Sequence, residues 1–219
     1  MMIHRALIFF KDFLQLYNVS VFYEGEMQMK KTLYIMRHGE TLFNAQKKIQ
    51  GWCDSPLTQR GIEQAKTAGQ YFKDNKIQFD AAYCSTAERA SDTLELVTDM
   101  PYTRLKGLKE LSFGVFEGEH EYLHPKMDPK KHFGDYYVQF GGEDNQAAQK
   151  RIATTLQKIM NQDNQTVLVV SHGGAMMMFS DLWTDIQKII QTGFTNCSIL
   201  KFTFENNKFY FQKIINFSK

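Results

Sequence analysis

The chain has 219 residues, 43% of them hydrophobic, which predicts a globular domain with a sizeable core. Its 26 basic and 24 acidic residues leave a net charge of +2, and this near-balance argues against a nucleic-acid or membrane-surface partner. The three cysteines, at positions 53, 84 and 197, lack metal-ligand spacing and are odd in number, so we expect reduced thiols in a cytoplasmic protein.

The first 28 residues form a separate segment in our interpretation. Residues 3–23 are apolar and aromatic, but a Lys-Asp pair interrupts the run, which is too short to span a bilayer and lacks a signal-peptide cleavage site. In a bacterial gene, Glu-Gly-Glu at 24–26 can be encoded by a purine-rich ribosome-binding sequence, followed by Met29 as a start. We expect residues 1–28 to be leader from an over-early start; the alternative is a genuine extension packed on the domain of residues 29–219.

From residue 29 onward, strand-like and helix-like segments alternate along the chain. This alternation predicts a single α/β domain: a three-layer sandwich with a mostly parallel central sheet and helices on both faces. Thr58 is a candidate helix N-cap, and an Asn-Asn turn joins the last two strands. We predict strands over 32–36, 79–84, 166–170, 198–204 and 208–214, and helices over 58–72, 86–97 and 145–160.

Residues 117–144 break this alternation, with three histidines, three lysines, two prolines and several aromatic residues. We interpret them as a lid inserted over the functional site and not as a second domain. The irregular spacing of His120, His124 and His132 is not typical of metal ligands, so we predict no metal site and no cofactor.

Two histidine-glycine motifs each follow a predicted strand. Arg37, His38 and a glycine come after the first strand, and His172 and two glycines come after the apolar run 166–170. Ligands bind beyond the carboxyl ends of parallel strands, so the two histidines can face one pocket there.

These residue types suit phosphoryl transfer. A phosphate monoester repels anionic nucleophiles, whereas a neutral imidazole can attack it and form a covalent intermediate that water cleaves. The guanidinium of Arg37 can donate a pair of hydrogen bonds to phosphoryl oxygens. Gly39 removes a side chain where the phosphate would approach the backbone.

Five blocks of sequence, in order, resemble the signature of the histidine phosphatase superfamily, whose members include phosphoglycerate mutases. The resemblance covers essentially all of residues 30–211. The blocks are LYIMRHGETLFNAQKKIQGWCDSPL at 33–57, STAERA at 85–90, LKEL with FG and EG at 108–118, GGE at 141–143 with Arg151, and SHGG at 171–174.

The resemblance implies specific roles for residues in these blocks. His38 would be the nucleophile and Glu110 the acid that protonates the leaving alkoxide, a positioned acid being worth about 10²–10⁴-fold in rate. The implied phosphate pocket adds four side chains around His38: Arg37, Asn44, Arg89 and His172. Gln50 and Gly51 would line the substrate side.

Some positions depart from the family pattern. Lys48 stands where many relatives carry arginine, which puts bidentate contact there in doubt. The carboxylates of Glu40 and Glu117 lie near the motifs, and we predict structural ion pairing or a solvated loop for both.

Three functions remain open, and we predict the first. A phosphatase acting on a small phosphorylated metabolite is favoured because residues 111–140 contain no arginine, whereas the mutase branch brings tandem arginines after the acid. The alternatives are a cofactor-dependent phosphoglycerate mutase and an inactive phosphate-binding or regulatory module. Neither the substrate nor the oligomeric state follows from the sequence.

Overall fold

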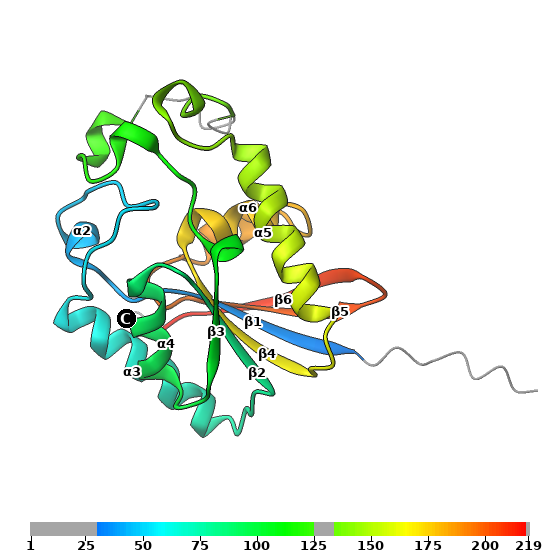
Figure 1. Cartoon of the computed structure of the whole chain (residues 1–219). Coiled ribbons are helices and arrows are strands. Elements are labelled where there is room, and N and C mark those ends of the chain that lie inside the picture. The colour runs from blue at the N-terminus through cyan, green and yellow to red at the C-terminus, as the bar shows by residue number, and fades with distance from the viewer. Residues whose placement is uncertain (1–29, 125–133, 218–219) are drawn as a thin grey trace, which may run out of the picture.

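One six-stranded sheet is the centre of the structure, a computed structural model that describes residues 30–124 and 134–217 (Figure 1). The prediction for residues 1–28 lies outside the described residues, as does part of the predicted lid, 125–133. The strands are β1 (Lys31–Arg37), β2 (Ala81–Ser85), β3 (Tyr102–Leu105), β4 (Thr166–Ser171), β5 (Ile199–Glu205) and β6 (Lys208–Ile215). In the order β3-β2-β4-β1-β5-β6, the first four strands are parallel, and β5 and β6 are antiparallel to their neighbours.

Helices cover both faces of the sheet, which confirms the predicted three-layer α/β sandwich (Figure 1). One layer contains α3 (Gln59–Asp74) and α4 (Glu88–Val97). The other contains α5 (Asn145–Met160), α6 (Gly173–Asp181) and α7 (Ile186–Gln191). A short helix, α2 (Leu42–Ala45), follows β1.

The central strands alternate their side chains between two cores. In β1, Leu33 and Ile35 join the core under α5 and α6, whereas Tyr34 and Met36 join the core under α3 and α4. All four side chains are buried because helices lie on both faces of the sheet. The continuous apolar run of β4 has the same explanation.

Local signals in the sequence located most of these elements. The hydroxyl of Thr58 accepts the Gly61 N–H at 3.0 Å, as expected of an N-cap, and α5 has the predicted bounds. Asn206 and Asn207 adopt left-handed backbone angles between β5 and β6. Four helices and strands were not predicted: α2 and α7 are short, β3 is a four-residue strand at the sheet edge, and α6 is apolar around its circumference and starts with two glycines.

Between β3 and α5, the described residues 106–124 and 134–144 form an arch with four single turns of 3-10 helix (Figure 1). They are η1 (Lys106–Leu108), η2 (Gly114–Phe116), η3 (Glu121–Leu123) and η4 (Val138–Phe140). The arch pairs with the loop after α2 through backbone hydrogen bonds. The Ile49 N–H donates to the Glu119 carbonyl at 2.7 Å, and the Glu121 N–H donates to the Lys47 carbonyl at 2.9 Å. The described parts of the predicted lid therefore lie against the loop that follows the first histidine motif.

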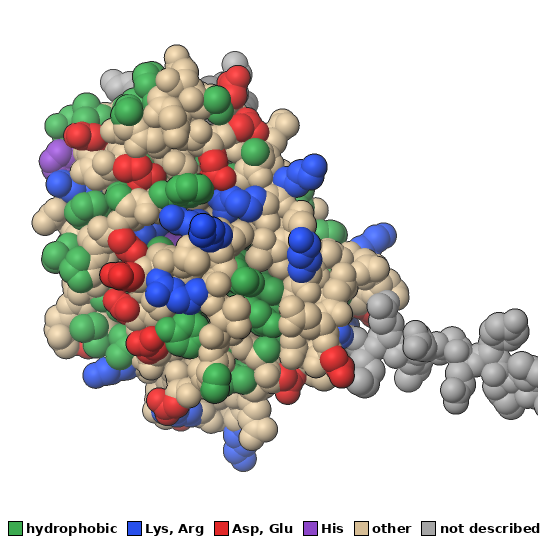
Figure 2. Space-filling view, in the orientation of Figure 1, with side chains coloured by type: hydrophobic (Ala, Val, Ile, Leu, Met, Phe, Trp, Pro, Cys, Tyr) green, Lys and Arg blue, Asp and Glu red, His purple; other side chains and the backbone are tan. Residues whose placement is uncertain are grey.

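Figure 2 shows acidic, basic and apolar side chains interspersed over one face of the molecule. Within residues 30–124 and 134–217, no helix combines the length and the apolar character that crossing a membrane requires.

Candidate active site

The pairing of β1 with β4 brings the two histidine motifs together. Arg37 is in register with Ser171, so each histidine is the next residue beyond its strand. His38 N–H continues the ladder by donating to the Ser171 carbonyl at 3.0 Å. The rings of His38 and His172 are 5.3 Å apart between centroids, and the residues are only 4% and 1% exposed. The two motifs thus occupy one buried site, as the sequence predicted.

The His38 ring is oriented by a backbone group. Its Nδ1 lies 2.8 Å from the Gly39 carbonyl oxygen, which can only accept, so Nδ1 carries the proton and Nε2 the lone pair. Burial, then the charges of Arg89 and Arg37, hold the pKa of His38 well below its ordinary value. The imidazole is therefore neutral near pH 7, with Nε2 available as a nucleophile.

Gly39 has a different reason to be glycine from the one that the sequence suggested. A Cβ here would lie 2.5 Å from the Gly61 carbonyl oxygen, at the start of α3. The close approach is therefore between two backbone segments, and this packing alone excludes a side chain. The Gly39 N–H donates to the Thr93 hydroxyl at 3.0 Å.

Several buried nitrogens around His38 have no hydrogen-bond partner among the described residues. They are Nε of Arg37, Nε of Arg89 and both ring nitrogens of His172. Unpaired buried polar groups are costly, and such a cluster is typical of a site that binds an anion. Burial, followed by the charges of Arg89, His38 and Arg37, lowers the pKa of His172 well below its ordinary value, so this ring is neutral as well.

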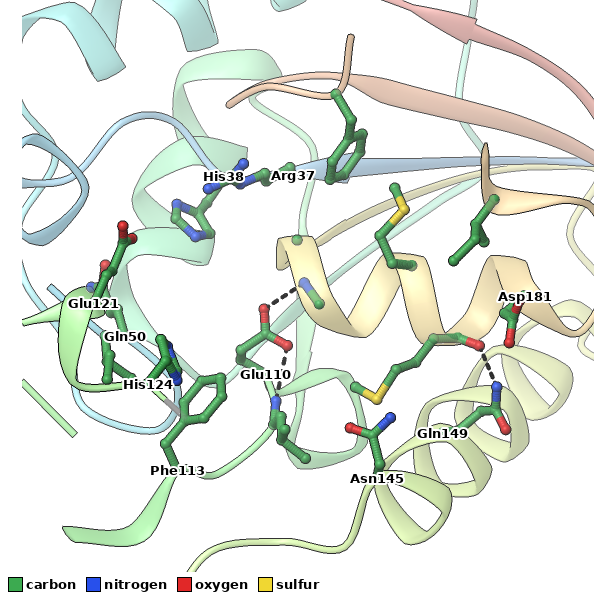
Figure 3. Close-up of a pocket in the computed structure, with 18 of the residues that line it drawn as sticks. Arg37, His38, Gln50, Glu110, Phe113, Glu121, His124, Asn145, Gln149 and Asp181 are labelled. Atoms are coloured by element: carbon green, nitrogen blue, oxygen red, sulfur yellow. Dashed lines mark hydrogen bonds between the residues drawn. The ribbon is translucent and has the colours of Figure 1, made fainter. Parts of the chain in front are cut away.

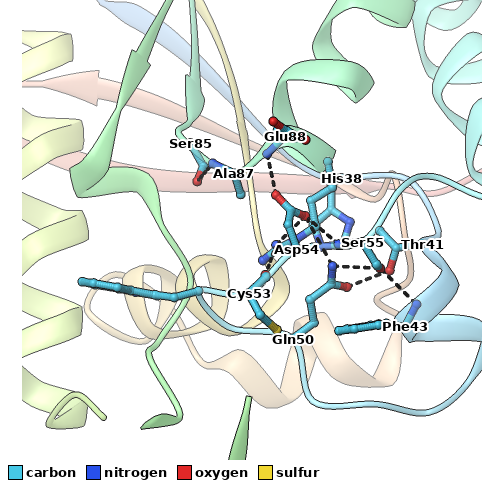
Figure 4. A network of polar contacts seen from close by, with 12 residues as sticks. His38, Thr41, Phe43, Gln50, Cys53, Asp54, Ser55, Ser85, Ala87 and Glu88 are labelled. Carbon is cyan, nitrogen blue, oxygen red and sulfur yellow. Dashed lines mark hydrogen bonds and ion pairs between the residues drawn. The ribbon is translucent and has the colours of Figure 1, made fainter. Parts of the chain in front are cut away.

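Arg89 is fully buried at the start of α4, and backbone carbonyls fix its guanidinium. Nη1 donates to the Cys53 carbonyl at 2.9 Å and to Asp54 Oδ1 at 3.0 Å, and Nη2 donates to the Gly51 carbonyl at 2.8 Å. Figure 4 shows Cys53 and Asp54 in this network beside His38. The guanidinium is thus held in one orientation with Nε unused.

Asn44 and Gln50 reach the site from the loop after β1. The Asn44 carbonyl oxygen accepts from Thr41 N–H at 3.2 Å and from Asn196 at 3.1 Å, which leaves its NH₂ group for a ligand. The Gln50 amide is engaged elsewhere, because it accepts from the Thr41 hydroxyl at 2.7 Å and donates to Ser55 at 3.1 Å (Figure 4). Gln50 therefore braces the loop, although it also lines the cavity.

Gly51 does not line the cavity with Gln50. A Cβ on Gly51 would lie 2.2 Å from the Leu111 carbonyl oxygen and 2.5 Å from the Glu117 carboxylate. Gly51 lies under the arch, where its carbonyl oxygen accepts from Arg89, and its predicted place on the substrate side stays a prediction.

Glu110 lies at the N-terminus of α6, 7% exposed. Its carboxylate accepts the N–H groups of Leu111 at 2.9 Å and Gly174 at 2.8 Å. Burial raises the pKa of Glu110 above its usual value, and this effect outweighs the hydrogen bonds that lower it. A Cβ at Gly174 would lie 2.7 Å from the same carboxylate, so the second glycine of the SHGG motif makes room for the acid.

A cavity of about 610 Å³ is lined by five of these residues: Arg37, His38, Asn44, Gln50 and Glu110. Figure 3 shows His38 and Arg37 on one side of it, Glu110 in the middle, and Asn145, Gln149 and Asp181 beyond. The sequence did not point to the last three, because two amides in the first turns of α5 and an acidic residue at the end of α6 resemble ordinary helix surface. Among residues 30–124 and 134–217, no group of histidine, cysteine and carboxylate side chains is placed to hold a metal ion.

Comparisons with known proteins agree with this architecture. A relative from Methylorubrum populi, named 2,3-bisphosphoglycerate-dependent phosphoglycerate mutase, is 30% identical over 169 residues, 68% of this chain and 76% of that protein. The structure of Bacillus stearothermophilus YhfR has a TM-score of 0.71 at 29% identity and covers 83% of this chain and 95% of its own. That of phosphoserine phosphatase from Entamoeba histolytica, solved with 3-phosphoglyceric acid, has a TM-score of 0.68 at 26% identity, covering 85% and 98%.

The sequence model of one enzyme family matches residues 33–216. This range is most of the chain and includes every residue of the site above. The chain belongs to the histidine phosphatase superfamily, branch 1.

Proposed function

We propose that this protein is a phosphatase that hydrolyses small phosphomonoesters through a phosphohistidine on His38, with Glu110 as the proton donor. The observation that carries the proposal is the state of His38: a buried neutral ring whose Nδ1–H is held by a carbonyl, beside donors that have no partner among the residues that the structure describes. This arrangement supplies both a nucleophile and a place for a phosphate.

In the first half-reaction, His38 Nε2 attacks phosphorus and the P–O bond to the alcohol breaks. Charge spreads over the equatorial oxygens, where Arg37, Arg89 and His172 can donate hydrogen bonds. The Gly39 carbonyl stabilises the positive charge that develops on the ring. The leaving alkoxide takes a proton from the Glu110 carboxyl, whose raised pKa favours the protonated form.

In the second half-reaction, water attacks the phosphohistidine. The Glu110 carboxylate left by the first step accepts a proton from this water, and the N–P bond breaks to return neutral His38. The same carboxyl thus serves as acid and then as base, and no net proton is stored between turnovers.

Hydrolysis is favoured over mutase chemistry by the arch. A mutase must keep water from its phosphohistidine and hold a carboxylated substrate, which calls for additional cations. Residues 111–140 contain no arginine, and their cations are Lys126, Lys130 and Lys131. Since one relative is named a phosphoglycerate mutase, mutase activity is the second candidate.

The test is a panel of phosphorylated metabolites assayed for phosphate release, together with 3-phosphoglycerate supplied with and without a bisphosphate primer. We expect phosphate release, little 2-phosphoglycerate and no effect of EDTA. Rapid primer-dependent isomerisation would select the mutase instead. Absence of both reactions on the whole panel would favour a phosphate-binding module.

A further inference from the structure

Glu117, on the arch, is bound to the backbone of the loop that contains residues 51–53. One carboxylate oxygen accepts the N–H groups of Gly51 at 3.0 Å and Cys53 at 2.9 Å. The other accepts those of Trp52 at 2.8 Å and Phe113 at 2.9 Å. The sequence had suggested an ion pair or a solvated loop for Glu117. Within the part of the chain that the structure describes it forms no ion pair, and its carboxylate joins two segments of backbone.

This carboxylate is charged. Burial raises the pKa of Glu117, but hydrogen bonds from the Cys53 thiol and from the backbone N–H groups outweigh burial, so the pKa lies below its usual value. Hydrogen bonds from N–H groups to a charged oxygen are stronger than those to a neutral one.

The carbonyls of the same loop hold Arg89. Gly51 and Cys53 each give their N–H to Glu117 and their carbonyl oxygen to the Arg89 guanidinium, at 2.8 Å and 2.9 Å. The loop has no regular secondary structure, so the side chains of Glu117 and Arg89 take the place of a neighbouring strand as hydrogen-bond partners of its backbone. Only glycine fits at position 51, because a Cβ there would lie 2.5 Å from Glu117.

We propose that Glu117 is a positioning residue for phosphate binding, which acts through the 51–53 loop to aim Arg89 at the phosphoryl group. This inference rests on the proposed function, in which Arg89 binds phosphate. An amide cannot replace the carboxylate, because each of the two oxygens accepts from two N–H groups. The NH₂ group of a glutamine would face two donors wherever it lay.

The probe is inorganic phosphate, and its Kd is measured by titration calorimetry. Glu117→Gln should weaken phosphate binding about 10- to 100-fold, since misplacing a group by about 1 Å can cost up to about 100-fold. Glu119→Gln is the matched control: it removes the same charge from an exposed side chain two residues away and should leave the Kd unchanged. Glu117→Asp keeps both oxygens and should recover part of the loss.

A double-mutant cycle tests whether the effect passes through Arg89. In an Arg89→Met background, Glu117→Gln should weaken phosphate binding by less than about threefold, because the group that it positions is gone. Equal losses in both backgrounds, or no loss in either, would overturn the proposal. Circular dichroism and thermal unfolding of each variant fix a temperature at which all are folded.

A second route from Glu117 leads to the acid, since the Trp52 indole N–H donates to the Glu110 carbonyl at 3.0 Å. The ratio of kcat/KM for an alkyl phosphate to that for an aryl phosphate reports on the acid alone. Glu117→Gln should leave this ratio unchanged, and a fall in the ratio as large as the loss of phosphate affinity would contradict the assignment to Arg89.

Phosphate binding needs no turnover, so the two proposals can fail separately. If the wild-type chain binds phosphate through Arg89 but hydrolyses no ester, the proposed function is wrong and the role of Glu117 is still decided by the cycle. If hydrolysis occurs but Arg89→Met leaves the phosphate Kd unchanged, the positioning role is wrong. A wild-type chain that does not bind phosphate would overturn both.

Discussion

The site has a floor and a wall that are built in different ways. The floor consists of His38 and His172, which follow paired strands and are placed by the backbone ladder of the sheet. The wall is the arch, which carries Glu110 and whose described residues, 106–124 and 134–144, form no helix longer than a single turn. Backbone hydrogen bonds join residues 118–121 of the wall to the loop at 47–49, and side chains hold the segment before them.

Two acidic side chains, those of Glu117 and Glu143, hold the wall by binding backbone groups. Glu117 binds the 51–53 loop, and Glu143 accepts from Ser112 N–H at 3.2 Å and pairs with Arg151 at 2.7 Å. Arg151 in turn donates to the carbonyls of Lys109 at 2.9 Å and Glu110 at 3.1 Å. The comparison teaches that an irregular segment can be well ordered when partly buried charged side chains satisfy its backbone groups.

The largest effect should come from the floor. His38→Ala should reduce turnover of every substrate by more than about 10³-fold, because it removes the nucleophile. Rapid quenching of the wild-type protein with substrate should leave an acid-labile, base-stable phosphate on His38. His120→Gln, a change of an exposed histidine on the arch, is the control and should keep normal turnover. Near wild-type activity of His38→Ala would refute the mechanism.

The wall should matter only for poor leaving groups. Glu110→Gln should slow hydrolysis of alkyl phosphates by about 10²–10⁴-fold but affect aryl phosphates much less, because a phenolate leaves without a proton. The measurement is kcat/KM on a matched pair of substrates. Equal losses on both would remove Glu110 from the role of proton donor.

Floor and wall meet at the SHGG motif, and two substitutions there should separate them. Gly174→Ala places a Cβ 2.7 Å from the Glu110 carboxylate and should reduce alkyl phosphate hydrolysis by about 10- to 100-fold more than aryl. Gly173→Ala places a Cβ 3.3 Å from Arg37 Nε and should reduce hydrolysis of the alkyl and the aryl phosphate equally, by a smaller factor. If both variants changed the alkyl-to-aryl ratio of kcat/KM equally, the effects on floor and wall could not be separated at this motif.

The smallest effect is a change in pH dependence. The active form needs neutral His38 and protonated Glu110, and the two pKa shifts, downward and upward, both widen the pH range in which this form exists. Activity should therefore fall on the acid side below the ordinary histidine pKa, and on the alkaline side above the ordinary carboxyl pKa. The alkyl-to-aryl ratio of kcat/KM cancels the His38 titration, so it should fall only on the alkaline side. A ratio independent of pH would show that Glu110 does not titrate as the acid.

The sequence by itself determined the layers of this protein and the chemistry of the floor. Continuous apolar runs locate β1 and β4, because both faces of these strands are buried, and the helical spacing of apolar residues locates α5, which is buried on one face. The histidine-glycine motifs lie directly after the apolar runs of β1 and β4, and this position indicates the nucleophile.

Only the tertiary structure decided how the motifs meet and what holds them. The strand order places β1 beside β4, and the contacts of Gly39 with Gly61 and of Gly51 with Leu111 join segments far apart in the chain. The role of Glu117 had no local signal, since its partners are backbone N–H groups and every residue but proline has one. A side chain that binds backbone across 64 to 66 positions leaves no period in the sequence, so only the folded chain reveals it.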